Sequence, residues 1–143
     1  MNKPIVLASD HGGFPLKDIV EGHLISKGYN VEYIGNQDES PIDHPVIAKR
    51  AAERVLFHGT DGIILCGTGI GVSIVANKYK GIRAAVVHSE AYAQLSRQHN
   101  HANVLCLGGR FLDGDMAKRI IDVFLETQYL GDRYKKRVDM YER

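Results

Sequence analysis

A cysteine precedes a glycine-rich loop in GIILCGTGIGVS, residues 62–73. Cys66 ends an apolar run, and Gly67, Gly69 and Gly71 follow within five residues. A thiolate at a strand end is stabilised by backbone N–H groups and by the start of a helix, and the same N–H groups can bind an oxyanion. The pattern predicts a base beside an oxyanion cradle, which suits proton abstraction next to a carbonyl. A small core cysteine before a tight turn is the alternative.

Three other uses of such a loop fit its spacing less well. A dinucleotide fingerprint, G-x-G-x-x-G, needs a third glycine where Val72 or Ile74 stands. The Walker pattern has no match, and a phosphatase-type cysteine needs an arginine at Val72. The sequence therefore disfavours a nicotinamide-dependent enzyme. A thiol redox protein is also disfavoured, because the second cysteine, Cys106, lies in the middle of a strand-like run.

Groups that could assist the thiol occur in two further places. SDHGG, residues 9–13, sets Asp10 and His11 after an apolar run, where they can reach a ligand or form only a solvated turn. His99 stands where a helix is expected to end. The helix dipole there favours a protonated imidazole, which can act as a general acid or simply satisfy free carbonyls. The adjacent Asn100 can offer its amide to a substrate hydroxyl.

The C-terminal stretch GDRYKKRVDMYER places two arginines on one face of a short helix. Arg133 and Arg137 are four residues apart, and paired guanidinium groups suit a phosphate better than lysines do. A solvated charged face is the ordinary alternative. Because Tyr134, Val138 and Tyr141 form only a narrow apolar stripe, we expect this helix to dock against another surface, namely a second subunit.

Alternating strands and helices must position these groups. Apolar runs predict strands at 4–9, 31–35, 62–66, 82–89 and 103–109. Apolar residues at helical spacing predict helices from Pro15 to Gly28 (with Leu16, Ile19, Val20 and Leu24 inward), from Pro45 to Gly59, and at about 71–79, 90–99 and 115–129, with a last charged helix after Gly131. Strands this continuously apolar are typical of a parallel sheet covered on both faces. The predicted fold class is therefore α/β: a Rossmann-like open parallel sheet of about five strands with helices on both faces.

The carboxyl ends of the strands are the expected place for a ligand, because open α/β sheets bind ligands there. That edge of the sheet should collect Asp10 and His11, Cys66 with its glycines, Ser89 with Glu90, and Arg110.

Bulk properties limit the class of protein. The 143 residues are 44% hydrophobic and 24% charged, which fits one globular domain spanning 1–143. A formal charge of +1 argues against nucleic acid or an anionic membrane as partner, and no apolar run is long enough to span a bilayer. The early first strand leaves no room for a signal peptide, and we expect two reduced cysteines in a cytoplasmic protein. Seven histidines show no metal-ligand spacing, so no metal is expected.

Five motifs, taken together, resemble a known family. They occur in order along the whole chain: ASDHGGFPLK, CGTGIGVSIVANK, GIRAAVV, LSRQHNHANVLCLGGR and GDRYKKRVDMYE. They are similar to the type B ribose-5-phosphate isomerases, a family that also includes galactose-6-phosphate isomerase subunits. The resemblance implies a cofactor-free aldose–ketose isomerase of the pentose phosphate pathway's non-oxidative branch. It also implies a homodimer, or a dimer of dimers, with active sites shared between subunits.

The resemblance also implies roles for individual residues. Cys66 matches the family's base, which moves a proton between C2 and C1 through an enediolate, and His99 matches the acid that opens the sugar ring together with Asp10. The remaining matches bind substrate: Gly67, Thr68, Gly69, Ile70 and Gly71 as the oxyanion loop, Thr68 also near the ring, His11, Arg133 and Arg137 at the phosphate, and Asn100 and Arg110 at other substrate atoms.

One position departs from the family pattern and leaves the substrate open. The family often has Asp-Tyr-Pro where this chain has Asp43, His44 and Pro45. A six-carbon phosphosugar, such as allose 6-phosphate or galactose 6-phosphate, is therefore an alternative substrate. A non-catalytic phosphosugar-binding module on the same fold is an alternative of another class.

Overall fold

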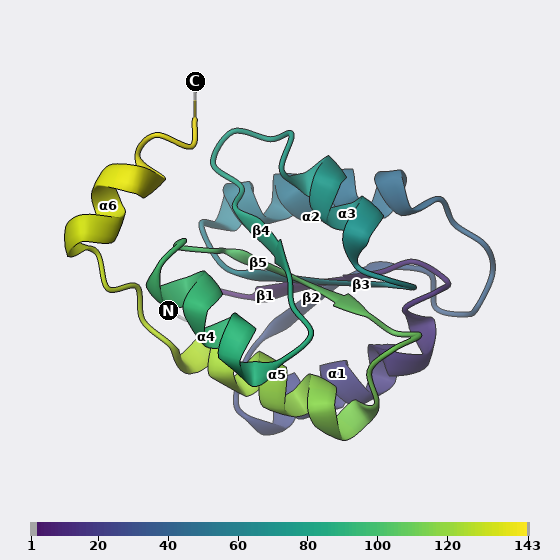
Figure 1. Ribbon diagram of the computed structural model, residues 1–143. Helices are drawn as coiled ribbons and strands as arrows, with labels where there is room; N and C mark the ends of the chain where they lie inside the picture. The colour runs from purple at the N-terminus through teal and green to yellow at the C-terminus, as the bar shows by residue number, and fades with distance from the viewer. Residues whose placement is uncertain (1–2, 143) are drawn as a thin grey trace.

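Five strands form one parallel sheet in the order β2-β1-β3-β5-β4 (Figure 1). In the computed structural model, which describes residues 3–142, they are β1 (Ile5–Ser9), β2 (Val31–Gly35), β3 (Gly62–Cys66), β4 (Ala84–Val86) and β5 (Val104–Gly108). Every residue of the three inner strands is buried, whereas β2 and β4 at the two sides of the sheet are half-buried. The predicted α/β fold with a parallel sheet is confirmed.

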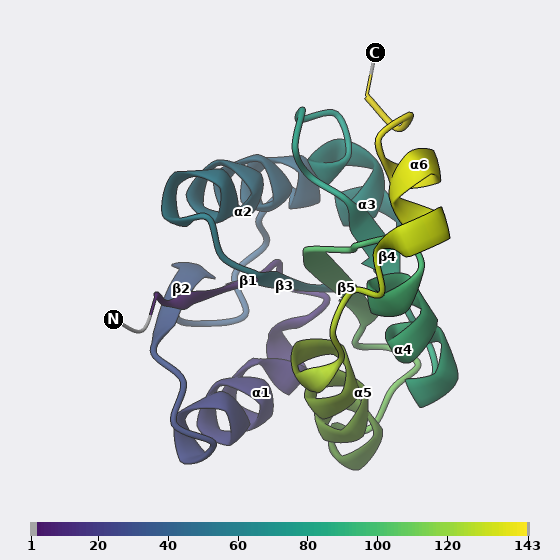
Figure 2. The ribbon, with the colours of Figure 1, turned by 90° about the vertical axis from the view of Figure 1, so that its left-hand side faces the viewer.

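Helices cover both faces of this sheet. They are α1 (Phe14–Ser26), α2 (His44–His58), α3 (Ile70–Ala76), α4 (Glu90–Gln98), α5 (Gly114–Glu126) and α6 (Asp132–Val138). Figure 2 shows α2 and α3 on one face and α1, α4 and α5 on the other. Each face has its own core: alanines of α2 bring that helix close to the sheet, and Phe124 of α5 fills the opposite side.

Two details of the predicted elements are wrong. Ile19 was expected inside α1 but is 41% exposed, while Lys17 is buried instead. Lys17 tolerates burial because its ammonium pairs with Asp18 and Glu21 and lies 4.4 Å from the ring centroid of Tyr33. The fourth strand was expected over 82–89, but only Ala84–Val86 pairs as a strand, with β5.

The strand register brings the carboxyl ends of the three inner strands to one level. Ser9 pairs with Leu65, and Cys66 pairs with Gly108. The chain segments that leave β1, β3 and β5 therefore meet at one edge of the sheet, which we call the carboxyl edge. The opposite edge, where the strands begin, is the amino edge.

Gly13 is expected to be intolerant of any side chain. A Cβ at this position would lie 2.4 Å from the backbone carbon of Leu65, so α1 could begin here only if it moved away from β3. We expect Gly13→Ala to destabilise the fold by about 1–3 kcal/mol, the usual effect of overpacking. Gly22→Ala is the matched control, because nothing lies within 4 Å of its Cβ position.

Urea denaturation at one protein concentration measures both variants. Because Gly22 lies in the middle of α1, alanine there should stabilise the protein by about 0.5–1 kcal/mol. Equal stability of the two variants would show that the contact between Gly13 and β3 is not tight.

Candidate active site

The point where the sheet reverses its order lies between β1 and β3. From β1 the chain adds β2 on one side, and it then returns to place β3 on the other. In open α/β sheets, ligands bind beside such a switch point, beyond the carboxyl ends of the strands. Asp10 and His11 follow β1 here, Cys66 ends β3 and residues 67–71 follow it, and Arg110 follows β5 nearby. The structure thus brings together these predicted site residues, which we call the carboxyl-edge group.

Cys66 is the thiol of this group. It is 5% exposed, and its Sγ accepts a hydrogen bond from the backbone N–H of Gly69 at 2.9 Å. Gly69 has a φ of 83°, a left-handed conformation that suits glycine and turns the loop into α3. An N–H that points at sulfur at the start of a helix stabilises negative charge there. The local geometry therefore places a nearly buried thiol beside a backbone donor at the start of the glycine loop.

Cys106 shows the opposite environment. It is completely buried in the middle of β5, and burial, together with the nearby Cys66, raises the pKa of its thiol far above the ordinary value. It therefore stays a neutral thiol. Both cysteines are free.

Backbone forms much of the floor of the carboxyl edge, because glycines from three loops lie against one another. A Cβ on Gly12 would lie 2.8 Å from the Gly67 nitrogen, and one on Gly109 would lie 3.0 Å from the Gly12 oxygen. A Cβ on Gly108 would lie 2.8 Å from the Thr68 oxygen. Sequence reasoning assigned no role to Gly12, Gly108 or Gly109, although they lie within two of the family motifs.

Asp10 is held at the mouth of the first loop. Asp10 is only 8% exposed, and its Oδ1 accepts a hydrogen bond from the backbone N–H of Gly13, at the start of α1, at 3.0 Å. Asp10 thus presents a fixed acceptor at the carboxyl edge.

Thr68 and Ile70 lie at the other end of the glycine loop. The Thr68 hydroxyl oxygen accepts the N–H of Ile70 at 3.1 Å, which fixes the hydroxyl against the start of α3. Ile70 itself is 54% exposed, so its side chain contributes surface rather than core. Ile70 therefore contributes to the loop through its backbone N–H.

Three cationic or imidazole side chains surround the floor. The guanidinium of Arg110 lies over Gly67, with Nε 3.1 Å from where a Cβ would stand. His11 accepts the backbone N–H of Ile42 through Nδ1 at 3.2 Å, which ties it to the loop before α2. His44 lies so close to Gly71 that its Nε2 is 2.5 Å from a Cβ placed there. His44, the departure from the family pattern, therefore forms a wall of this site.

Four of the predicted residues lie at the amino edge instead. Helix α4 starts beyond the carboxyl end of β4 and runs back along the sheet, so His99 and Asn100 at its end are far from Cys66 in the same chain. Helix α6, with Arg133 and Arg137, lies beyond this edge as well, on the left of Figure 1. We call these four residues the amino-edge group. One chain does not bring the two groups together.

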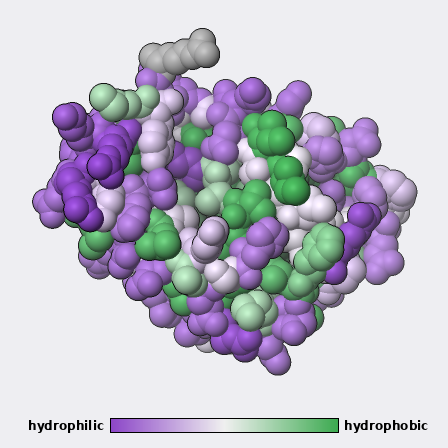
Figure 3. All heavy atoms as spheres, in the orientation of Figure 1, coloured by the Kyte–Doolittle hydropathy of each residue, from purple (hydrophilic) through white to green (hydrophobic). Residues whose placement is uncertain are grey.

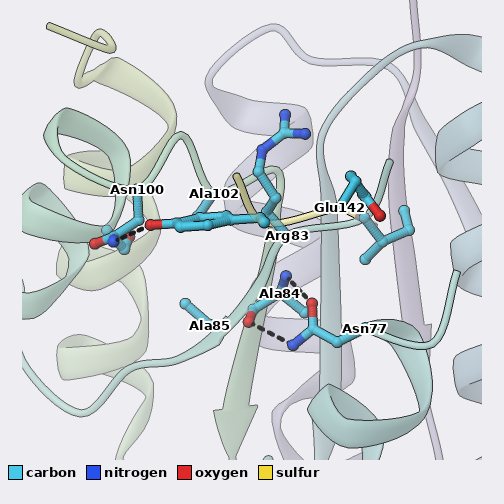
Figure 4. Close-up of a pocket in the computed structure, with 10 residues that line it drawn as sticks. Asn77, Arg83, Ala84, Ala85, Asn100, Ala102 and Glu142 are labelled. Atoms are coloured by element: carbon cyan, nitrogen blue, oxygen red, sulfur yellow. Dashed lines mark hydrogen bonds between the residues drawn. The ribbon is translucent and has the colours of Figure 1, made fainter. Parts of the chain in front are cut away.

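A pocket of about 400 Å³ lies beside β4 and not at the carboxyl edge (Figure 4). The amide of Asn77 bonds both the N–H and the carbonyl of Ala84, which caps that part of the free side of β4. Asn100 and the C-terminal Tyr141 and Glu142 line the same pocket. It is the space beneath the C-terminal tail, and the carboxyl-edge group has no part in it.

Two further observations concern metals and membranes. Within residues 3–142, no three His, Cys, Asp or Glu side chains gather closely enough to hold a metal ion. Among the same residues, no helix is both long and apolar enough to cross a bilayer.

Comparison with known proteins gives consistent matches. The sequence profile described as Ribose/Galactose Isomerase matches residues 5–141. Ribose-5-phosphate isomerase B of Escherichia coli K12 is 44% identical over 138 residues, which cover 96% of this chain and 93% of that protein. The galactose-6-phosphate isomerase subunit LacB of Clostridium acetobutylicum is 41% identical over 126 residues, which cover 87% of this chain and 73% of that subunit.

Solved structures match over the same length. A ribose 5-phosphate isomerase from Thermotoga maritima has a TM-score of 0.94 at 42% identity, covering 99% of this chain and 98% of the other. Ribose-5-phosphate isomerase B from Mycoplasma genitalium with bound ribulose-5-phosphate has a TM-score of 0.91 at 42% identity, covering 95% and 91%.

Proposed function

Since this chain belongs to the ribose/galactose isomerase family, we propose that it interconverts D-ribose 5-phosphate and D-ribulose 5-phosphate as one cofactor-free domain spanning residues 1–143. The observation that carries the proposal is Cys66, buried at the switch point with an N–H donor on its sulfur. A base beside convergent N–H groups is what an enediolate mechanism requires.

The proposed reaction moves one proton and its charge between sulfur and substrate. In the open-chain sugar, the Cys66 thiolate removes the proton from C2, and the C2–H electrons form the C1–C2 double bond while O1 becomes negative. The N–H groups of residues 67–71 stabilise this oxygen. A proton then passes from O2 to O1, the C2=O bond forms, and the thiol returns its proton to C1. The Gly69 N–H that bonds sulfur at the start is released as the sulfur becomes neutral.

Ring opening comes before this step. We assign to His99 the delivery of a proton to the ring oxygen, while Asp10 accepts the proton of the O1 hydroxyl. Arg133, Arg137 and His11 bind the phosphate, and Arg110 and Asn100 bind other substrate oxygens. This assignment needs the carboxyl-edge group and the amino-edge group in one site.

A second copy of this chain supplies the missing group in our proposal. A two-fold axis makes each copy give and receive the same residues, so two complete sites form between two chains. Exposed apolar side chains occur along the side of the molecule between the two groups: Ile70, Ile74, Tyr92 and Leu95. Figure 3 shows this side, with hydrophobic residues gathered over α3, β4 and α4. Helix α6, which has no buried residue, docks on the partner in this arrangement.

The redox state of Cys66 indicates where such an enzyme works. The base is a free thiol and must stay reduced to accept a proton. The cytoplasm keeps thiols reduced, so we propose a cytoplasmic location.

Isomerisation in heavy water tests the activity. Purified protein is mixed with ribose 5-phosphate, without added metal or cofactor, and the mixture is followed by NMR. We expect ribulose 5-phosphate that carries deuterium at C1, because a thiol proton exchanges with solvent before it returns. Allose 6-phosphate and galactose 6-phosphate are tested in parallel. Conversion of a six-carbon sugar alone would correct the substrate, and no conversion of any sugar would favour a binding module.

A further inference from the structure

Two tyrosines of the C-terminal segment contact the amino-edge group. The Tyr134 ring stacks on the His99 ring, with centroids 4.1 Å apart and an interplanar angle of 12°. The Tyr141 hydroxyl accepts a hydrogen bond from the Asn100 amide at 2.7 Å, drawn in Figure 4. Neither tyrosine has a role in the assignment above.

Tyr134 has a second partner on its own helix. Arg133 donates to the Tyr134 hydroxyl through Nη2 at 2.8 Å, and its guanidinium carbon lies 4.9 Å from the ring centroid. This bond uses one of the five N–H donors of a guanidinium. One aromatic ring therefore contacts both the proposed acid and a proposed phosphate ligand.

Hydrogen bonds hold the chain on both sides of α6: the Leu130 N–H donates to the Gln98 carbonyl at 3.2 Å, and the Gly81 N–H donates to the Glu142 carboxylate at 2.7 Å. No residue of this seven-residue helix is buried. Gly131 and Asp132 both have positive φ, 69° and 46°, so the chain turns sharply as it enters the helix. Two residues of α6 are half-buried, Tyr134 and Val138, and Tyr134 is the one that stacks on His99 at the end of α4.

We propose that Tyr134 is a positioning residue that holds the His99 imidazole and the Arg133 guanidinium in one fixed relation, so that the acid and the phosphate ligand form a preassembled unit. The inference rests on the proposed isomerase function. The stacked ring restricts rotation of the imidazole, and the hydroxyl restricts the guanidinium. Restricting both groups before substrate arrives lowers the entropy lost when they act together. Tyr141 restrains the neighbouring Asn100 in the same way.

Two substitutions of Tyr134 separate its two contacts. Tyr134→Phe keeps the ring and loses the hydroxyl, so we expect kcat within about twofold of the wild-type value and KM raised about three- to tenfold. Tyr134→Leu loses the stack as well, and we expect kcat to fall about tenfold or more in addition. Steady-state kinetics with ribose 5-phosphate measure both.

A second stacked pair in the same region provides a matched control. His101 and Tyr129 have ring centroids 4.1 Å apart and an interplanar angle of 5°, and neither has an assigned role. Tyr129→Leu removes an equivalent contact and should leave kcat unchanged. An unchanged kcat in Tyr134→Leu, or an equal loss of kcat in the two leucine variants, would overturn the positioning role.

NMR of the His99 ring tests the stack without any catalysis. The ring current of Tyr134 shifts the His99 imidazole protons upfield, and we expect this shift in the wild type and in Tyr134→Phe but not in Tyr134→Leu. If the wild type isomerises no sugar, the proposed function is refuted, and the chemical shift of the His99 protons still tests whether Tyr134 stacks on His99. If the wild type is active but shows no upfield shift, the positioning proposal fails alone.

Discussion

In the Cys66→Ser variant, we expect kcat for ribose 5-phosphate to fall about 10²- to 10⁴-fold, the usual contribution of a positioned general base. Serine keeps the size of the side chain and can still accept the Gly69 N–H, but its hydroxyl does not ionise near neutral pH as a thiol can. Deuterium incorporation at C1 should be lost in parallel. KM should change little, because the phosphate ligands are intact.

Cys106→Ala is the control for this result. Cys106 lies on the neighbouring strand, is also buried and has no assigned role in the reaction. We expect the free energy of unfolding of this variant to fall by about 1 kcal/mol. Its activity should stay at the wild-type level. Undiminished deuterium exchange in Cys66→Ser would refute the thiolate mechanism, since no other residue is proposed to remove the C2 proton.

Mixing two inactive variants should restore activity. Cys66→Ser and His99→Asn homodimers each lack one essential group in both sites. A heterodimer of the two places both substitutions in one shared site and leaves the other site intact. We therefore expect the purified heterodimer, selected with two different affinity tags, to have about half the wild-type activity.

The same experiment distinguishes shared from separate sites. If each chain built its own site, both sites of the heterodimer would carry one substitution, and activity would stay at the level of the parents. A heterodimer of Cys66→Ser with wild-type chains is the reference, because it retains one intact site in either arrangement. Activity no higher than in the parent variants would disprove the proposed exchange of residues.

The general fold was predictable because its signals are local. Continuous apolar runs such as that ending at Cys66 indicate buried parallel strands, and parallel strands place all of their following loops at one edge. Asp10, Cys66 and Arg110 could therefore be assigned to one site without any contact being known. The exposure of Ile19 was not predictable, because Lys17 is buried through an ion pair and a ring contact that depend on the tertiary fold.

The amino-edge group marks the limit of sequence reasoning. That His99 ends a helix could be inferred, but its stack on Tyr134 depends on the turn at Gly131 and Asp132. A different backbone conformation at this turn would send α6 in another direction without any change in its amino-acid composition. The backbone contacts of Gly12 and Gly109 were missed for a related reason: close approach of two loops leaves no periodic signal.

The close backbone contacts between the glycine loops have a consequence for how such an enzyme can diverge. A mutation of Gly12 or Gly108 has to displace main chain, so the backbone around the proposed oxyanion loop tolerates little change. His44 and the arginines of α6 are side chains that can be exchanged one at a time. New sugar specificities should therefore evolve through exchange of these side chains, while the backbone of the glycine loops stays the same.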